Sequence, residues 1–363
     1  MTEASSRAAA RELHRRAIVI DGHSDILMPL ADGRMRLAER VEVELPEGWQ
    51  GAAFAPRHQQ ATPYQLSPYT MWFQCMGQYD IPRFREGGLT AQVMAIYIDD
   101  ADLARPLERA LDMAAAFHRE LAANPDMLLH ATSAADIRRA KAEGKTALLL
   151  SFEGGEPLGR NLNLLEIFYR LGLRMISLTH SRRNELADGT QLNIQTGGLT
   201  RLGRELIGRM NDLGILIDLA HLSDPGIWEI LELSRDPVLL THTNVRAGAP
   251  GYRAGLTEID PQRGTSKLRA LAERGGVAGV IFWGQPSLEA VADEIEAAIQ
   301  HAGDDHVALG SDFYGREQAP RGLEDIGQLP ALTEELLRRG YGEPTVLKIL
   351  GGNLLRVFEQ VLR

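Results

Sequence analysis

The sequence has little cysteine and no long hydrophobic segment. Its single cysteine, Cys75, excludes an intramolecular disulfide and makes a cysteine-based zinc site implausible, so we expect a reducing compartment. No segment approaches the roughly 18 consecutive apolar residues of a membrane-spanning helix, and residues 1–16 lack the apolar core of a signal peptide. Residues 354–363 are amphipathic, which is typical of a terminal packing helix and not of a lipid-anchor signal. These absences predict a cytoplasmic protein without a membrane partner.

Negatively charged residues outnumber positively charged ones. The chain has 39 Lys and Arg against 49 Asp and Glu, which gives a formal net charge of −10. Because phosphate binding needs a concentrated positive surface, we expect no nucleic-acid partner. Apolar material is plentiful: 44% of the 363 residues are hydrophobic and 24% are charged, enough for a sizeable core.

Eight short apolar segments recur along the chain and predict β-strands. They are residues 18–20, 91–98, 146–150, 175–178, 215–219, 238–240, 277–282 and 307–309. Helical patterns lie between most of them, at residues 103–121, 134–143, 164–171, 202–213, 227–233, 267–273 and 288–301. Repeated strand–helix units predict an α/β fold, a (β/α)8 TIM barrel, with a doubly wound open sheet as the alternative.

Two regions depart from this rhythm. Residues 31–88 include a stretch rich in Pro, Gln, Ala and Tyr without a clean period, which predicts an elaborated first βα loop over the barrel mouth. Residues 322–363 contain two further helical patterns, which predict C-terminal helices. No linker divides the chain, so we expect a single barrel domain over residues 1–363.

Six of the eight predicted strands lead into His, Asp or Glu. In chain order these residues are His23 and Asp25, Glu153, His180, His221, His242 and Asp312. Barrel enzymes place their chemistry at the C-terminal ends of the strands, so these side chains are expected to meet. Any one of them could simply cap a strand, but six strands ending in this way favour a common site.

The residue types indicate a metal centre. Imidazole and carboxylate ligands suit Zn²⁺ or a similar divalent cation. Residues i and i+2 of an extended segment point to one side, so His23 and Asp25 can bind one ion, and Glu153 can bridge two ions through its two oxygens. Two cations that share a hydroxide generate a nucleophile at neutral pH, which predicts hydrolysis. No suitably placed Ser-His-Asp set is present, which argues against covalent catalysis.

The motifs around these residues resemble those of the renal or membrane dipeptidase family, the di-zinc M19 peptidases, from about residue 17 to the C-terminus. The matching motifs are Asp21-Gly22-His23-Ser24-Asp25, Ser151-Phe152-Glu153-Gly154, Leu178-Thr179-His180, Asp218-Leu219-Ala220-His221, Gly310-Ser311-Asp312-Phe313 and Gly351-Gly352-Asn353-Leu354-Leu355-Arg356-Val357-Phe358. The resemblance implies a barrel of the metal-dependent hydrolase type that binds two Zn²⁺ ions. It also implies that His23, Asp25 and Glu153 bind one zinc, that Glu153, His221 and His242 bind the other, and that Glu153 and a hydroxide bridge them.

The resemblance further implies how a substrate would bind. His180 would contact it and stabilise the oxyanion, Asp312 would transfer the proton of the bridging water, and Arg253 would bind a dipeptide's C-terminal carboxylate. Trp283 could line the pocket or simply pack at the barrel rim. The loop after His180 is unusually basic, so Arg183 or its neighbour Arg182 could favour an acidic substrate residue.

We therefore expect a zinc dipeptidase of the bacterial, soluble branch, acting on small dipeptides that include L-Xaa-D-Xaa, with a homodimer as the assembly. One alternative is another amidohydrolase-type enzyme acting on a cyclic amide or lactone. Such enzymes typically carry His-x-His on the first strand and often a bridging Lys, and this chain has His-x-Asp and a Glu. The other alternative is a catalytically silent metal-binding barrel, but silent relatives usually lose a ligand or the proton-transfer group.

Overall fold

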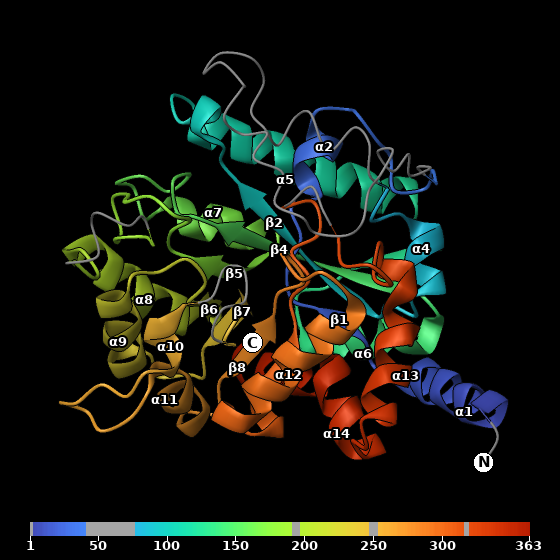
Figure 1. The fold of residues 1–363 in the computed structure, drawn as a ribbon. Helices are drawn as coiled ribbons and strands as arrows, with labels where there is room; N and C mark the ends of the chain where they lie inside the picture. Colours follow the sequence, from blue (N-terminus) through green and yellow to red (C-terminus); the bar gives the residue numbers. More distant parts are fainter. Residues whose placement is uncertain (1–2, 41–76, 191–196, 247–252, 316–318) are drawn as a thin grey trace, which may run out of the picture.

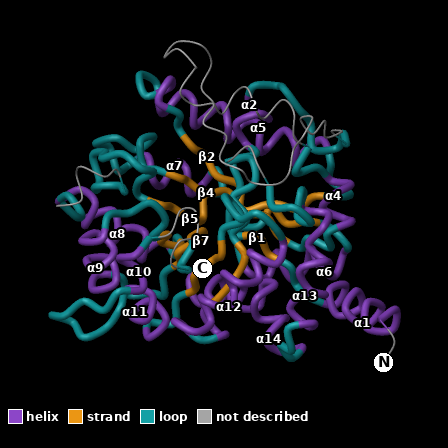
Figure 2. Tube along the Cα trace, viewed as in Figure 1, coloured by secondary structure: helices purple, strands orange, loops and turns teal. Residues whose placement is uncertain are grey.

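The computed structural model describes residues 3–40, 77–190, 197–246, 253–315 and 319–363. Strands at the centre are surrounded by helices, as Figure 1 and Figure 2 show. Most of the predicted first βα loop, residues 41–76, lies outside the described residues, as does Cys75. The prediction of a single domain over the whole chain therefore stays a prediction.

Eight parallel strands close into a barrel. They are β1 (Ile20–Asp21), β2 (Ala91–Tyr97), β4 (Thr146–Glu153), β5 (Leu173–Ser177), β6 (Leu216–Asp218), β7 (Leu239–Thr243), β8 (Val277–Val280) and β9 (Val307–Leu309). Each pairs in parallel with its neighbours, β2 pairs with β4, and β1 pairs with both β2 and β9, which closes the ring. The predicted (β/α)8 barrel is therefore confirmed, and closure excludes the open sheet.

A ninth strand, β3 (Leu128–His130), is absent from the sequence prediction. It pairs with Thr146, Ala147 and Leu148 at the start of β4, and β5 pairs with the later residues of β4. The strand β3 has only three residues and no period that could separate it from a loop, so the sequence carries no signal for it.

The helices cover the outside of the barrel (Figure 1). In the described residues they are α1 (Glu3–Arg16), α2 (Leu27–Ala31), α4 (Ile81–Glu86), α5 (Pro106–Ala123), α6 (Ala134–Glu143), α7 (Leu164–Arg170), α8 (Arg201–Leu213), α9 (Asp224–Leu233), α10 (Ala254–Thr257), α11 (Lys267–Glu273), α12 (Leu288–Ala302), α13 (Leu329–Arg338), α14 (Glu343–Leu347) and α15 (Asn353–Val361). Among these helices, none combines the length and apolarity that crossing a bilayer requires.

Local sequence explains where these helices begin and end. Ser133 caps α6 through a capping box with Asp136, and Thr200 caps α8 by accepting the backbone N–H of Gly203. Gly144 and Gly214 follow the same two helices with φ of 69° and 68°, a left-handed conformation that costs glycine little. Each turn returns the chain to the start of the next strand, so the sequence itself sets the strand–helix alternation.

The barrel interior is tightly packed. All eight residues of β4 are buried, as expected for a parallel strand covered on both faces. Gly279 lies where β7 and β8 approach closely, because a Cβ atom at this position would stand 1.9 Å from the carbonyl oxygen of Thr241. The backbone therefore needs glycine there.

We predict that G279A lowers the free energy of unfolding by about 1–3 kcal/mol, because the new methyl group pushes β7 and β8 apart. G208A is the matched control, since Gly208 is exposed inside α8 and an added methyl group there would meet no atom within 4 Å. Alanine there should raise stability by up to about 1 kcal/mol. Chemical denaturation of both variants measures the difference, and a G279A protein as stable as the wild type would contradict the close approach.

Candidate functional site

The residues predicted to form the site gather at the C-terminal ends of the barrel strands. Glu153 is the last residue of β4 and His242 lies within β7. The others follow strand ends: His23 and Asp25 after β1, His180 after β5, His221 after β6 and Asp312 after β9. Parallel strands end at one face of the barrel, so side chains from distant parts of the sequence meet there.

Three imidazoles converge on one carboxylate oxygen. Oε1 of Glu153 is 3.0 Å from Nε2 of His221, and 3.6 Å from Nε2 of both His23 and His242. The Nε2 atoms of His221 and His242 are themselves 2.8 Å apart. Because Nε2 of each ring faces the same carboxylate oxygen, these imidazoles and Glu153 can act together as metal ligands.

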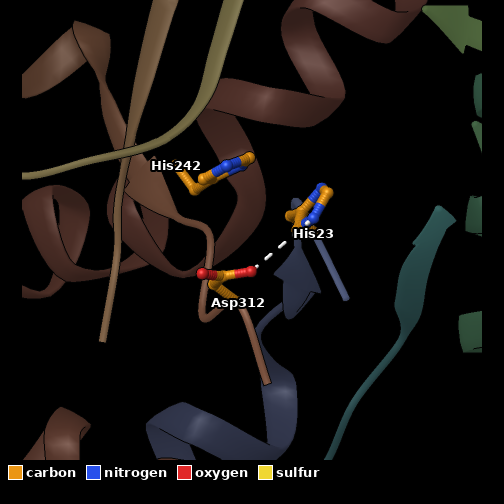
Figure 3. Close-up of side chains that lie close together, drawn as sticks. All are labelled: His23, His242 and Asp312. Atoms are coloured by element: carbon orange, nitrogen blue, oxygen red, sulfur yellow. Dashed lines mark ion pairs between the residues drawn. The ribbon is translucent and has the colours of Figure 1, made fainter. Parts of the chain in front are cut away.

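His23 also faces two further carboxylates. Its Nε2 atom is 3.9 Å from Oδ1 of Asp25. The same atom is 3.7 Å from Oδ1 of Asp312, and a dashed line marks this pair in Figure 3. His23 is 2% exposed, and its Nε2 has no hydrogen-bond partner among the described residues. Burial, followed by the charge of His221, lowers the pKa of His23 to about 3. The ring is therefore neutral at physiological pH, which is the form that binds a metal.

These residues fit a divalent metal ion. Three groups of described side chains place ligand atoms within 4.8 Å of one another: His23, Asp25 and Glu153; His23, His242 and Asp312; Glu153, His180 and His221. The donors are imidazole nitrogens and carboxylate oxygens, which suit zinc. Nε2 of His23 is buried among three carboxylates and has no hydrogen-bond partner among the described residues. A bound cation would give this nitrogen the partner that a buried polar atom needs.

The backbone is strained where it presents two of these side chains. His221 and Asp312 adopt φ of 58° and 61°, and Tyr314 adopts 64°, although residues with a Cβ rarely occupy this region. Gly315 follows directly, and a Cβ atom there would lie 2.2 Å from Oδ1 of Asp312 and 2.7 Å from Oδ2 of Asp25. Strained residues of this kind cluster at functional sites, because the surrounding structure fixes them.

A buried hydrogen-bond network supports the carboxylate side of the cluster. Asp21 accepts hydrogen bonds from the backbone N–H of Ser311 at 2.8 Å, from its hydroxyl at 2.6 Å, and from the hydroxyl of Tyr79. This network joins β1, which leads into His23, to the loop that carries Asp312. Sequence reasoning missed Tyr79, since it lies in the region 31–88 that has no clean period.

Three tilted rings in contact border the other side. The ring of His180 lies between those of Tyr97 and His221, with centroid distances of 4.7 and 4.3 Å. Tyr97 ends β2 and pairs in register with Glu153. Sequence reasoning missed Tyr97 as well, although an aromatic residue at the end of a predicted strand is a weak signal for it.

Arg182 connects three loops by hydrogen bonds beside these rings. Its Nε donates to Oε1 of Glu156 at 3.2 Å, and its two terminal nitrogens donate to Asp100 and to the carbonyl oxygen of Ile98. These partners follow β4 and β2, and Arg182 itself follows β5. The arginine therefore fixes the loops around His180.

The three remaining predicted substrate residues have partners outside the cluster. The side chain of Arg183 is 57% exposed and binds Asp188 through Nε and Nη2, the latter at 2.7 Å. Nη2 of Arg253 donates to the carbonyl oxygen of Leu222 at 2.8 Å and to Oδ1 of Asp224 at 3.0 Å. Trp283 follows β8, and its carbonyl oxygen accepts a hydrogen bond from Asn244 at 3.4 Å. None of these contacts joins the three residues to the cluster, so their roles stay predictions.

Known proteins resemble the chain along most of its length. The family model for membrane dipeptidase (peptidase family M19) matches residues 7–363. A dipeptidase of Aspergillus oryzae is 32% identical over 307 residues, which cover 78% of this chain and 70% of that protein. Dipeptidase 3 of Rattus norvegicus is 34% identical over 304 residues, which cover 78% of this chain and 59% of that protein.

A solved structure matches the whole fold. It is a metallopeptidase from Rhodobacter sphaeroides liganded with a phosphinate mimic of the dipeptide L-Ala-D-Ala. Its sequence is 26% identical, its TM-score is 0.75, and the match covers 95% of this chain and 99% of that one.

The depressed pKa of His23, about 3, predicts how the metal-free protein responds to acid. In the unfolded chain the pKa of a histidine is about 6.5. Below that pH the unfolded state binds a proton that the folded state does not bind, so the free energy of unfolding falls as the pH falls. The loss should approach about 1.4 kcal/mol per pH unit for this group. Removing the imidazole in H23N should reduce the slope of stability against pH between about pH 6.5 and 4.

Denaturant unfolding with a chelator present measures both slopes. H301N is the control, because His301 is exposed at the end of α12 and its removal should leave the slope unchanged. Equal slopes in wild type and H23N would show that His23 is not held neutral by the fold.

Proposed function

The chain belongs to the membrane dipeptidase family, peptidase family M19, and on this basis we propose that it is a zinc-dependent dipeptidase. The observation that carries the proposal is the convergence of His23, His221 and His242 on Oε1 of Glu153. The Rhodobacter relative binds a mimic of L-Ala-D-Ala, which supports dipeptides with a D-residue at the second position among the substrates.

Two zinc ions would bind on either side of Glu153. His23, Asp25 and Glu153 would hold one, and Glu153, His221 and His242 the other, as their interatomic distances of 2.8 to 3.9 Å support. When bound, such ions polarise a carbonyl oxygen and lower the pKa of a shared water. The two carboxylates of this group, Asp25 and Glu153, would offset half of the charge of two such ions.

Asp312 is the group proposed to move the proton. Its side chain is 10% exposed and its Oδ1 atom faces Nε2 of His23 at 3.7 Å. It would take the proton from the attacking water at Oδ1 and give it to the amine that leaves when the peptide bond breaks. The backbone at Asp312 adopts φ of 61°, a strained conformation of the kind that clusters at functional sites.

His180 is proposed to bind the substrate's carbonyl oxygen. Its ring is held between Tyr97 and His221 and beside the loops that Arg182 fixes. An imidazole N–H in this position would donate to the oxygen as negative charge develops on it.

Arg253 is proposed to recognise the C-terminal carboxylate. Leu222 and Asp224 hold one end of its guanidinium, and Lys267 lies 3.3 Å from the same Asp224, so the three charged groups carry a net charge of about +1. A planar guanidinium can bind a carboxylate through two hydrogen bonds. In a dipeptide the carboxylate lies one residue beyond the bond to be cleaved, so this contact would place that bond at the metal site. A longer peptide would need additional space on the N-terminal side of its last peptide bond.

Other expectations stay predictions. Arg182 and Arg183 already bind carboxylates, so a preference for acidic substrates would need them to exchange partners. The lining role of Trp283, a homodimer and a cytoplasmic location rest on the sequence and the resemblance.

The function is tested with a dipeptide panel of both stereochemistries at the second position, with the zinc content of the same sample measured. We expect hydrolysis of dipeptides, little hydrolysis of tripeptides, and activity that rises as zinc increases to two ions per chain. D312N should bind zinc normally and lose at least about a hundredfold in kcat, as expected when a general acid–base group is removed.

Two results would contradict these expectations. A zinc-loaded protein that cleaves no dipeptide would reject the function. Full activity with one zinc per chain would reject the two-metal centre.

We also predict that R253M lowers kcat/KM for a dipeptide by about 10- to 100-fold, mainly through KM, because hydrogen bonds to a charged group contribute about 1.5–3 kcal/mol. The same dipeptide with a C-terminal amide should be cleaved equally by wild type and R253M. R263M is the control, as Arg263 lies on the surface and binds Glu232 and Asp260. Equal losses for the acid and the amide would remove Arg253 from carboxylate recognition.

A further inference from the structure

A short hydrogen-bonded chain leads from the barrel interior to the histidine cluster. Asp218 ends β6, and Thr241 and His242 are neighbours in β7. The hydroxyl of Thr241 is 2.7 Å from Oδ2 of Asp218 and 2.9 Å from Nδ1 of His242. All three residues are at most 5% exposed, so water does not compete for these hydrogen bonds.

We propose that Thr241 is a positioning residue that fixes the tautomer of His242, so that Nε2 of this ring presents a lone pair to the metal centre. The proposal deepens the proposed function and rests on it in one respect, the assignment of His242 as a metal ligand. Thr241 itself touches neither metal nor substrate in this scheme.

The positions of the hydrogens follow from counting donors. Oδ1 of Asp218 accepts the backbone N–H groups of Ala220 at 3.0 Å and Thr241 at 2.9 Å, which leaves Oδ2 for the hydroxyl of Thr241. Burial raises the pKa of Asp218, and the hydrogen bonds from Ala220 and Thr241 oppose that rise by favouring the ionised form. In the ionised form the carboxylate has no hydrogen to give, so the Thr241 hydroxyl donates to Oδ2. Its oxygen is then left as an acceptor, and Nδ1 of His242 must supply the hydrogen of the remaining bond.

This arrangement has a consequence for the cluster. With its hydrogen on Nδ1, His242 directs the lone pair of Nε2 toward Oε1 of Glu153 at 3.6 Å and Nε2 of His221 at 2.8 Å. If Nε2 of His221 also presented a lone pair, the two nitrogens would repel at this distance. A cation between them, or a hydrogen on His221, relieves the repulsion, so the hydroxyl of Thr241 prepares one side of a cation site.

The hydroxyl can be removed while the backbone hydrogen bond between the strands stays in place. The strands β6 and β7 pair in register at Asp218 and Leu239, and the backbone N–H of Thr241 reinforces this pairing through Asp218. Valine has nearly the shape of threonine and keeps that N–H. T241V therefore deletes both hydroxyl contacts, to Nδ1 of His242 and to Oδ2 of Asp218, and keeps the backbone hydrogen bond from Thr241 to Oδ1 of Asp218. A change at Asp218 would remove that backbone hydrogen bond as well.

The test compares T241V with T241S and T243V. Thr243 lies two residues along the same strand, and its hydroxyl is buried with no hydrogen-bond partner among the described residues, so T243V is the matched control. Zinc affinity is measured by competition with a chelator. The His242 tautomer is read from the side-chain ¹⁵N shifts of the metal-free protein.

We expect T241V to weaken the binding of one of the two zinc ions by about 10- to 100-fold, the usual effect of losing a group that orients a ligand. T241S, which restores the hydroxyl, and T243V should bind zinc as the wild type does. In the wild type, His242 should carry its hydrogen on Nδ1, and T241V should populate both tautomers.

Three results would overturn the proposal: wild-type zinc affinity in T241V, an equal loss in T243V, or a hydrogen on Nε2 of His242 in the metal-free wild type. Neither measurement uses a substrate, so a failure of dipeptide hydrolysis does not affect them. If the wild type binds no zinc, the proposed function fails, and the ¹⁵N shifts still decide the tautomer.

Discussion

The barrel mouth holds three carboxylates close to one neutral imidazole, and much else in the structure depends on this. Asp25, Glu153 and Asp312 lie 3.9, 3.6 and 3.7 Å from Nε2 of His23. Like charges gathered in a site that excludes water repel strongly unless cations or protons compensate them. His23 cannot compensate them, because burial keeps it neutral. Bound metal ions would supply this compensation.

The barrel tolerates this repulsion because its buried strands and outer helices hold the strand ends in place. Buried strands and the helices around them fix the strand ends, and the loops beyond adopt costly conformations at His221 and Asp312. Each such residue costs about 1–3 kcal/mol, which only a well-packed surrounding can hold. Binding of ions by the same residues would offset this conformational cost, so the strain and the metal affinity depend on each other.

The sequence predicted the barrel, and the polar residues at its strand ends lie close together in the structure, because both follow from regular signals. Apolar segments at intervals mark the strands, and polar residues at their ends mark one face. The rest depends on contacts between distant segments. Tyr79 reaches Asp21 from a region without a period, and Arg182, which could have met a substrate, is instead held by Glu156 and Asp100. A sequence shows that an arginine is present, but only the fold shows which carboxylate it binds.

The two sides of the cluster differ in charge. Three carboxylates face Nε2 of His23, whereas Glu153 lies near His180 and His221, and Glu153 and Asp312 lie near His242. A cation on the first side meets most of the negative charge and should be held mainly by electrostatic attraction. A cation on the second side depends on neutral imidazoles, whose lone pairs must be directed correctly before it arrives. Hydrogen bonds that orient the rings, such as the one from His242 to Thr241, therefore matter most where charge contributes least.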